Sequence, residues 1–206
     1  MTNYMTDVQN MFIETIKLID GEPVNLDRHQ ERMRRTLAHL GGAANLQSLR
    51  SVADKFSNCR GLQKLRVVYG PLGVSNVSCS PYTMRSVKSL KVVDGQGVDY
   101  SYKYADRSQI DRLVSLKGAC DDVLVVKDGF VTDTSFTNIA ICDSGRWLTP
   151  RRPLLCGTKR ARLLADGVIA ESDVTIDDLL WAGGLMLFNA MIEFGELEVD
   201  VSAVKF

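Results

Sequence analysis

Three groups of residues in the chain could do chemistry, and none of them selects a reaction by itself. Lys103 lies between Tyr102 and Tyr104, and its amine could act once its pKa is lowered from about 10.4. Asp133 offers a carboxylate, and residues 157–159 open a basic helix whose free N–H groups would favour an anion. Each group also has an ordinary structural interpretation, as a surface charge, a turn residue or a solvated helix start.

The composition is that of a globular chain, and it narrows the possible partners. Apolar residues make up 45% of the 206 positions, which is enough for a core in one compact unit or two small lobes. The 25 basic and 25 acidic side chains cancel, which predicts no nucleic-acid and no membrane partner. Five scattered cysteines and two histidines predict neither a disulfide framework nor a metal site. Because the start lacks a signal peptide, we expect a cytoplasmic location.

The elements that must position these groups begin with a mixed first lobe. A strand over 10–19, the turn Asp20-Gly21 and a short return predict a hairpin. Apolar residues at helical spacing predict a helix over 26–40, with Asp27 as its N-cap and Gly41-Gly42 as its end. Further elements are expected in order along the chain: a weaker helix over 46–56 and strands over 63–70, 73–82 and 86–93.

Residues 94–104 form the best candidate linker, and a second mixed lobe follows it. Asp128-Gly129 and Asp143-Ser144-Gly145 each separate two predicted strands. Helices are predicted over 106–118 (capped), 157–167 and 175–182, and a strand pair over 184–194 and 196–204 closes the chain. We therefore predict an α+β chain of two lobes, residues 1–98 and residues 99–206, with Lys103 in the second lobe.

Five segments carry a resemblance to a known family by their order. They are FIETIKLIDGEPVNLDRHQERM, KYADRSQIDRL, DGFVTDTSFTNIAI, TPRRPLLCGTKRARLL and LMLFNAMIEF. In this order they resemble five segments of class IV aminotransferases. The first two are the opening with Phe-Glu-Thr and His-x-x-Arg and the segment of the Schiff-base lysine. The other three are Val-Thr-Glu-x-Ser-x-x-Asn, the phosphate loop Thr-Pro…Gly-Ile-x-Arg and the last strand of the catalytic lobe. The resemblance to these pyridoxal-phosphate enzymes of fold type IV covers nearly the whole chain.

The resemblance implies a fold, a cofactor and an assembly. The fold would be the two-lobed, D-amino acid aminotransferase-like one, with an N-terminal α/β sandwich lobe and a C-terminal lobe of mixed strands with helices. The cofactor would be pyridoxal 5′-phosphate. Family members place the active site between the lobes and at a subunit boundary, which implies a homodimer.

The resemblance also assigns catalytic roles to two residues. Lys103 would hold pyridoxal phosphate as a Schiff base and then move the α-proton of the substrate as acid and base. Asp133 would accept the pyridinium N–H and keep the ring protonated as an electron sink. The family usually has glutamate at this position, so the shorter aspartate is a departure.

Five further positions would hold the cofactor phosphate. Arg32 would bind it with charge-assisted hydrogen bonds. The backbone N–H groups of Thr158 and Lys159, with the Thr158 hydroxyl, would complete the phosphate site at a helix N-terminus. Asn189 and Ala190 lie where the last strand reaches the phosphate in the family. Thr158 and Lys159 differ from the commonest family residues, and Gln9-Asn10-Met11 replaces the usual Gly-Asp-Gly. The family sequence that usually precedes this opening is also missing, so we expect a truncated member.

The reaction stays open between two outcomes of shared chemistry. Asn-Ala at 189–190 resembles the pattern of aminodeoxychorismate lyases, and Ile13 replaces the tyrosine of D-amino acid transaminases. Arg85, Arg107 and Lys159 could meet a substrate with two carboxylates. We therefore favour 4-amino-4-deoxychorismate lyase, releasing pyruvate and 4-aminobenzoate, over a branched-chain or D-amino acid transaminase.

Two other interpretations remain as rivals. A non-catalytic relative would keep the fold without the chemistry, but it would have no physical need for Lys103, Arg32, an acid at position 133 and the Gly157 loop together. A generic binding domain with Cys156 as a reactive thiol lacks a histidine near that cysteine in the sequence. Cys156 could instead make the phosphate loop sensitive to oxidation.

Overall fold

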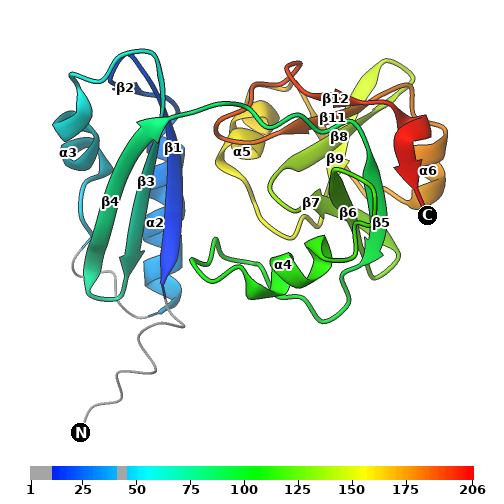
Figure 1. Ribbon diagram of the computed structural model, residues 1–206, viewed down its shortest axis with the longest axis horizontal. Coiled ribbons are helices and arrows are strands. Elements are labelled where there is room, and N and C mark those ends of the chain that lie inside the picture. The colour runs from blue at the N-terminus through cyan, green and yellow to red at the C-terminus, as the bar shows by residue number, and fades with distance from the viewer. Residues whose placement is uncertain (1–10, 41–45) are drawn as a thin grey trace, which may run out of the picture. The chain divides into compact units, whose positions relative to one another are not determined.

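A computed structural model describes residues 11–40 and 46–206, and the chain forms two compact units in it (Figure 1). Unit 1 contains the described residues up to Thr83 together with Tyr102–Asp106, and unit 2 contains Met84–Ser101 and Arg107–Phe206. This division differs from the boundary predicted at 98/99. The segment that carries Lys103 packs with unit 1, although it follows the first residues of unit 2 along the chain.

Unit 1 is built on an antiparallel sheet with the strand order β2-β1-β3-β4. The strands are β1 (Phe12–Ile19), β2 (Glu22–Pro23), β3 (Leu62–Gly70) and β4 (Gly73–Pro81). The predicted turn between β1 and β2 is confirmed: Asp20 and Gly21 have φ of 49° and 86°, and Ile19 pairs with Glu22. Positive φ at both central residues matches the right-handed twist of the strands and fixes a two-residue turn.

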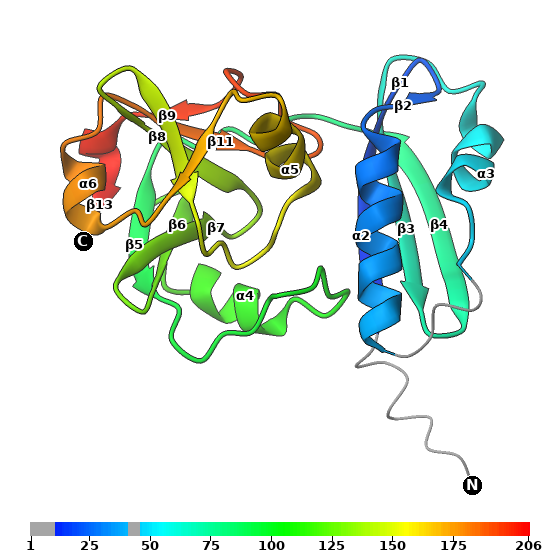
Figure 2. The same cartoon turned by 180° about the vertical axis from the view of Figure 1, so that it is seen from behind.

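Helix α2 (Leu26–His39) covers one face of this sheet (Figure 2). Its buried Met33 and Leu37 meet alternate residues of β1, such as Phe12 and Ile16, in one core, because side chains two apart on a strand share a face. The predicted helix is confirmed, but its predicted cap is wrong. Asn25 occupies the N-cap position with φ of 57° and no side-chain cap hydrogen bond, and Asp27 lies in the first turn. The predicted stop at Gly41-Gly42 lies outside the described residues.

The weaker predicted helix of unit 1 is present in two short pieces. Helix α3 (Leu49–Ala53) begins at Ser48, whose side chain accepts a hydrogen bond from Ser51 N–H, and a 3₁₀ turn (Asp54–Phe56) follows it. Three residues of α3 are buried in the same core: Leu49, Val52 and Ala53.

Lys103 lies on a short segment that runs beside β1. Ile13 N–H donates to the Lys103 carbonyl at 2.9 Å, and Ala105 N–H donates to the Met11 carbonyl at 2.8 Å. Tyr104 forms an isolated bridge with Phe12, and their rings lie 5.3 Å apart. Backbone pairing and ring packing together fix this segment in unit 1.

Unit 2 is built on a mixed sheet with the order β10-β9-β8-β7-β6-β5-β13, to which β11 adds at β8 and β12 adds at β11. Its strands are β5 (Leu90–Asp94), β6 (Asp122–Lys127), β7 (Phe130–Thr134), β8 (Asn138–Asp143), β9 (Arg146–Pro150), β10 (Ala170–Ser172), β11 (Leu185–Phe188), β12 (Glu198–Val199) and β13 (Val204–Lys205). Strand β5 pairs in parallel with β6. This pairing places the strand predicted over 86–93 in unit 2.

Two predicted hairpin turns of unit 2 are confirmed by their backbone. Asp128 and Gly129 have φ of 52° and 81°, and the turn after Asp143 has φ of 48° at Ser144 and 79° at Gly145. Strand β7 is tied to β8 through one residue pair, Asp133 with Asn138. The turn between these strands therefore brings the carboxylate of interest beside an amide.

The helices of unit 2 are α4 (Ser108–Val114), α5 (Thr158–Ala165) and α6 (Ile176–Leu180). The cap predicted for the 106–118 helix is absent, because Arg107 occupies the N-cap position without a side-chain cap bond. Helix α5 buries Leu163 against Ala140, Met186 and Phe188. This packing fixes α5 relative to β8 and β11. No helix in the part of the chain that the structure describes is long and apolar enough to cross a membrane.

Candidate active site

Glu14 is the centre of a buried polar cluster in unit 1. It lies on β1 between Phe12 and Ile16 and faces α2, where His29 and Arg32 are one helical turn apart. Arg32 donates from Nε to Glu14 Oε1 at 2.8 Å and from Nη2 to Oε2 at 2.5 Å. His29 Nδ1 lies 2.6 Å from Glu14 Oε2. The carboxylate therefore holds both helix side chains in fixed orientations.

The charges of this cluster follow from its burial and its partners. Burial alone would raise the pKa of Glu14, but Arg32 and the hydrogen bonds outweigh it and lower that pKa to about 2. Burial lowers the pKa of His29 against the attraction of Glu14, and Arg32 and Lys103 lower it further. The cluster at neutral pH is therefore an ionised Glu14 with Arg32⁺ and a neutral His29.

Lys103 belongs to this neighbourhood electrostatically, since its charge acts on His29. Its side chain is half-buried, and its backbone is fixed to β1. Tyr102 stacks on His39 of α2 at 4.9 Å and approaches Phe12 edge-on at 6.0 Å. The aromatic residues beside Lys103 therefore fasten its segment within unit 1.

Asp133 is the corresponding centre in unit 2. It is buried on β7, only 4% exposed, and its carboxylate accepts from Asn138 Nδ2 at 2.8 Å and from Leu155 N–H at 2.9 Å. Desolvation raises the pKa of Asp133 to about 7, and the two donors with the more distant Arg160 oppose this rise. Among the described residues, Asp133 forms no ion pair with a lysine or arginine.

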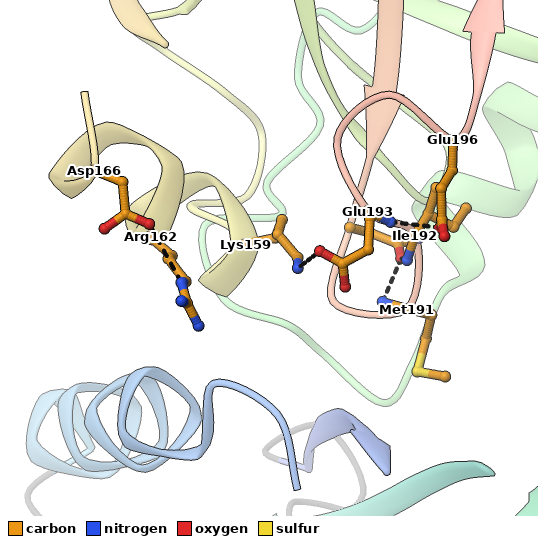
Figure 3. Close-up of polar contacts among 8 residues, drawn as sticks. Lys159, Arg162, Asp166, Met191, Ile192, Glu193 and Glu196 are labelled. Carbon is orange, nitrogen blue, oxygen red and sulfur yellow. Dashed lines mark hydrogen bonds and ion pairs between the residues drawn. The ribbon is translucent and has the colours of Figure 1, made fainter. Parts of the chain in front are cut away.

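The first turn of α5 begins directly after the loop that holds Asp133. Thr158 and Lys159 are buried at this turn, and the first N–H groups of a helix have no partner within the helix. The Lys159 ammonium forms an ion pair with Glu193, which lies in the turn after β11 (Figure 3). This ion pair weakens the prediction that Lys159 meets a substrate carboxylate, because its charge is already balanced.

Asn189 and Ala190 follow β11 rather than lying within the strand. Asn189 Nδ2 donates to the Phe136 carbonyl at 3.1 Å, and its Oδ1 accepts from Met191 N–H at 2.8 Å and from Ile192 N–H at 3.1 Å. The Asn189 amide thus joins the turn after β11 to the β7–β8 turn. Half-buried Ala190 lies in the same turn.

Two arginines predicted for substrate carboxylates contact the β7–β8 turn. Arg107 Nη2 donates to the Ser135 carbonyl at 3.0 Å, and the Arg85 guanidinium lies over the Phe136 ring at 5.3 Å. Arg85 also donates to the Asp121 carbonyl. These contacts give both side chains structural roles at that turn.

The predicted site residues thus fall into two sets, one in each unit. Unit 1 brings together Arg32 and Lys103 around His29 and Glu14. In unit 2, Asn138 and Leu155 N–H bind Asp133 just before the 157–159 turn. Asn189 contacts the β7–β8 turn through the Phe136 carbonyl. Three residues were quoted in the motifs without being assigned a function, and the structure shows them as the partners: Glu14, Asn138 and Glu193. The alternation of β1 could have indicated Glu14, since its neighbours at 12 and 16 are apolar.

The comparisons with known proteins agree with this architecture. The sequence profile described as Amino-transferase class IV matches residues 11–197, so the chain belongs to the class IV aminotransferase family. A Haemophilus somnus 129pt crystal structure, described provisionally as a 4-amino-4-deoxychorismate lyase, is 31% identical with a TM-score of 0.82, covering 89% of this chain and 97% of that one. The predicted fold, that of fold type IV pyridoxal-phosphate enzymes, is confirmed.

Two sequence relatives extend over most of the chain. An uncharacterized protein of Haemophilus influenzae is 32% identical over 183 residues, which are 86% of this chain and 96% of that protein. A Schizosaccharomyces pombe protein named provisionally as aminodeoxychorismate lyase is 28% identical over 200 residues, 88% of this chain and 85% of the relative. The family depends on pyridoxal phosphate, and the chain is a pyridoxal-phosphate-dependent enzyme.

The described residues fit this cofactor. Asp133 is a buried carboxylate that forms no ion pair with another described residue. It suits a protonated ring nitrogen, because that positive charge would favour the ionised form of the Asp133 carboxylate. The first turn of α5, which begins at Thr158, suits a phosphate dianion, because the N-terminal end of a helix favours anions. Bound pyridoxal phosphate supplies an electron sink for negative charge at the substrate α-carbon.

Proposed function

We propose that the protein is a 4-amino-4-deoxychorismate lyase that releases pyruvate and 4-aminobenzoate. The observation that carries this choice is the Asn189-Ala190 pair directly after β11, with the Asn189 amide held against the Phe136 carbonyl. The lyase names of the Haemophilus somnus and Schizosaccharomyces pombe relatives support it. Atoms balance without a co-reactant, since the substrate divides into the two products.

In this proposal Lys103 anchors the cofactor and moves the proton. Its Nζ takes the proton from the ring carbon that bears the amine, and the carbon–oxygen bond to the enolpyruvyl group then breaks. The same proton returns to the leaving group, which becomes pyruvate. Backbone pairing with Ile13 keeps Lys103 at a fixed position, which general acid–base chemistry requires.

The other residues bind and orient. Arg32, aligned by Glu14, and the first turn of α5 at Thr158 and Lys159 bind the phosphate. Asp133 accepts the ring N–H. Asn189 and Ala190 shape the site at the end of β11. We further propose that the enzyme works in the cytoplasm as a homodimer, as the family resemblance implies, and sedimentation velocity at micromolar concentration tests the assembly.

Cofactor anchoring is tested first by absorption spectroscopy. Wild type, Lys103→Ala and the exposed control Lys55→Ala are incubated with pyridoxal phosphate, and the excess is removed. We expect the visible band of lysine-bound cofactor in the wild type and the control, and its loss in Lys103→Ala. A band that persists in Lys103→Ala would remove this lysine from the proposal.

The reaction is tested by its products. Supplying aminodeoxychorismate should yield pyruvate and 4-aminobenzoate in equal amounts, and Lys103→Ala should yield neither. If pyridoxamine phosphate instead accumulates with D-alanine or a branched-chain amino acid, the enzyme is a transaminase. Cofactor binding with neither reaction would favour the non-catalytic relative.

A further inference from the structure

Three residues of unit 2 close a small ring of hydrogen bonds around the carboxylate of Asp133. Asn138 Nδ2 donates to Asp133 Oδ1 at 2.8 Å and to the Leu155 carbonyl at 2.9 Å. Leu155 N–H donates to Asp133 Oδ2 at 2.9 Å. One amide therefore joins the carboxylate on β7 to the loop that precedes α5.

The Asn138 amide is also fixed by steric contact. A Cβ atom at Gly157 would lie 2.0 Å from Asn138 Oδ1, so only glycine at position 157 leaves room for it. Asn138 is 6% exposed and is directly opposite Asp133 in the β7–β8 pairing. Its side chain is thus held between a strand and the loop with little freedom to turn away.

This arrangement acts on the protonation of Asp133. Burial favours the neutral acid, whereas an N–H donor to each oxygen favours the carboxylate. The Leu155 donor belongs to the backbone and remains in any variant. Asn138 is the side chain whose replacement would change the balance.

We propose that Asn138 is a positioning residue that keeps Asp133 aligned, favours its ionised form and links that carboxylate to the 155–157 loop. The inference rests on the proposed role of Asp133 toward the cofactor ring. The proposed role of Asn138 also explains how aspartate can serve where the family usually has glutamate. Asn138 and the backbone of Leu155 hold the shorter side chain at both of its oxygens.

The decisive experiment titrates Asp133 in the protein without added cofactor. Carboxyl ¹³C chemical shifts of labelled aspartate are followed with pH, and Asp133→Asn identifies the resonance. The test variant is Asn138→Leu, which keeps the volume and removes the donor. The control is Thr137→Val, which removes the hydroxyl that contacts Thr134 at 2.6 Å. Thr137 is also buried, at 3% exposure against 6% for Asn138.

We expect the Asp133 midpoint to rise by one pH unit or more in Asn138→Leu and to stay at the wild-type value in Thr137→Val. A folded Asn138→Leu protein with an unchanged midpoint would overturn the inference. If that variant fails to fold, Asn138→Ser gives the same comparison, because serine is too short to replace both amide contacts.

Cofactor affinity as a function of pH provides a second readout. A rise of the Asp133 midpoint from about 7 by one unit should weaken pyridoxal phosphate binding about fivefold near pH 7, because half of the wild-type carboxyls are ionised there. The affinity should recover toward pH 9. A loss that is equal at every pH would mean a structural role only. If wild type binds no pyridoxal phosphate, the proposed function fails, and the titration without cofactor still decides the role of Asn138.

Discussion

Arg32 and Glu14 form a two-point ion pair inside unit 1, between the helix α2 and the strand β1. The side chains are 9% and 0% exposed, and the two bonds measure 2.8 and 2.5 Å. Because Nε and Nη2 of Arg32 both donate to Glu14, the plane of the guanidinium group is fixed. An arginine aligned in this way can meet a phosphate without first losing side-chain freedom.

Replacing Glu14 should destabilise the protein strongly. Glu14→Gln keeps the shape but leaves a buried guanidinium without its counter-charge, and we expect a loss of about 3 kcal/mol in the free energy of unfolding. The control is Glu31→Gln on helix α2, where Glu31 and Arg34 form a similar two-point pair at the surface. Urea denaturation should show little change for the control. An equal loss of unfolding free energy in Glu14→Gln and Glu31→Gln would contradict the prediction that the buried ion pair matters more than the exposed one.

Acid should remove the contribution of Glu14 over a defined range. The folded pKa of Glu14 is about 2, against 4.5 for the free side chain. The carboxylate therefore contributes its full stability above pH 4.5, and this contribution is lost as pH falls toward 2. Stability measured from pH 6 to pH 2.5 should fall more steeply in the wild type than in Glu14→Gln. Parallel curves would mean that the pair does not control acid stability.

Local patterns in the sequence predict much of the fold. The turns at Asp20-Gly21 and Asp128-Gly129 and the helix α2 depend on neighbouring residues only, and the structure confirms all three. The N-cap of α2 could not be predicted in this way, because Asn25 takes a left-handed backbone as the chain leaves the hairpin. Asp27 satisfied the capping preference but lies in the first turn, two residues after the actual N-cap.

Long-range packing decides what the sequence pattern leaves open. The strand β5 looks like a continuation of the first lobe, but its Leu90 pairs in parallel with Asp122 of β6, across the intervening helix α4. Lys103 follows β5 and still packs with β1 through Ile13. Asn138 is recognised only by the partners that tertiary structure gives it, Asp133 and Leu155. Glu14 could have been indicated by the alternation of β1, but its contacts with Arg32 and His29 could not.

The Lys159–Glu193 ion pair gives an asymmetric prediction. The Lys159 side chain is 5% exposed and that of Glu193 is 42% exposed, so removal of Glu193 leaves a poorly solvated ammonium at a helix start that already favours anions. Glu193→Gln should cost about 1–2 kcal/mol after allowance for solvent screening. Lys159→Met should cost less, because methionine fills the same space without a charge.

The double variant distinguishes a true pair from two separate effects. Lys159→Met combined with Glu193→Gln should recover most of the stability lost in Glu193→Gln alone, as thermal unfolding would report. Additive losses would show that the two side chains act independently. The turn after β11 would then still be held by Asn189 and Glu196, whose side chains accept from the Met191, Ile192 and Glu193 N–H groups.

Adding one methyl group at Gly157 should damage the cofactor site more than the fold. In Gly157→Ala the new Cβ would meet Asn138 Oδ1 at 2.0 Å, so either the amide or the loop before α5 must move. Asp133 then loses a donor, and the first turn of α5 shifts with Thr158. We expect at least tenfold weaker binding of pyridoxal phosphate and a loss of about 1–3 kcal/mol in stability.

Gly183→Ala is the matched control for Gly157→Ala, because its Cβ would meet the Cys142 carbonyl at an ordinary 3.7 Å and its φ is not positive. Affinity measured by cofactor fluorescence should be unchanged there. If Gly157→Ala also binds normally, Asn138 has room to turn away, and the tight contact is not what holds the carboxylate. If its affinity falls while Gly183→Ala matches the wild type, the glycine is required by the Asn138 amide rather than by backbone flexibility, since Gly157 has no positive φ.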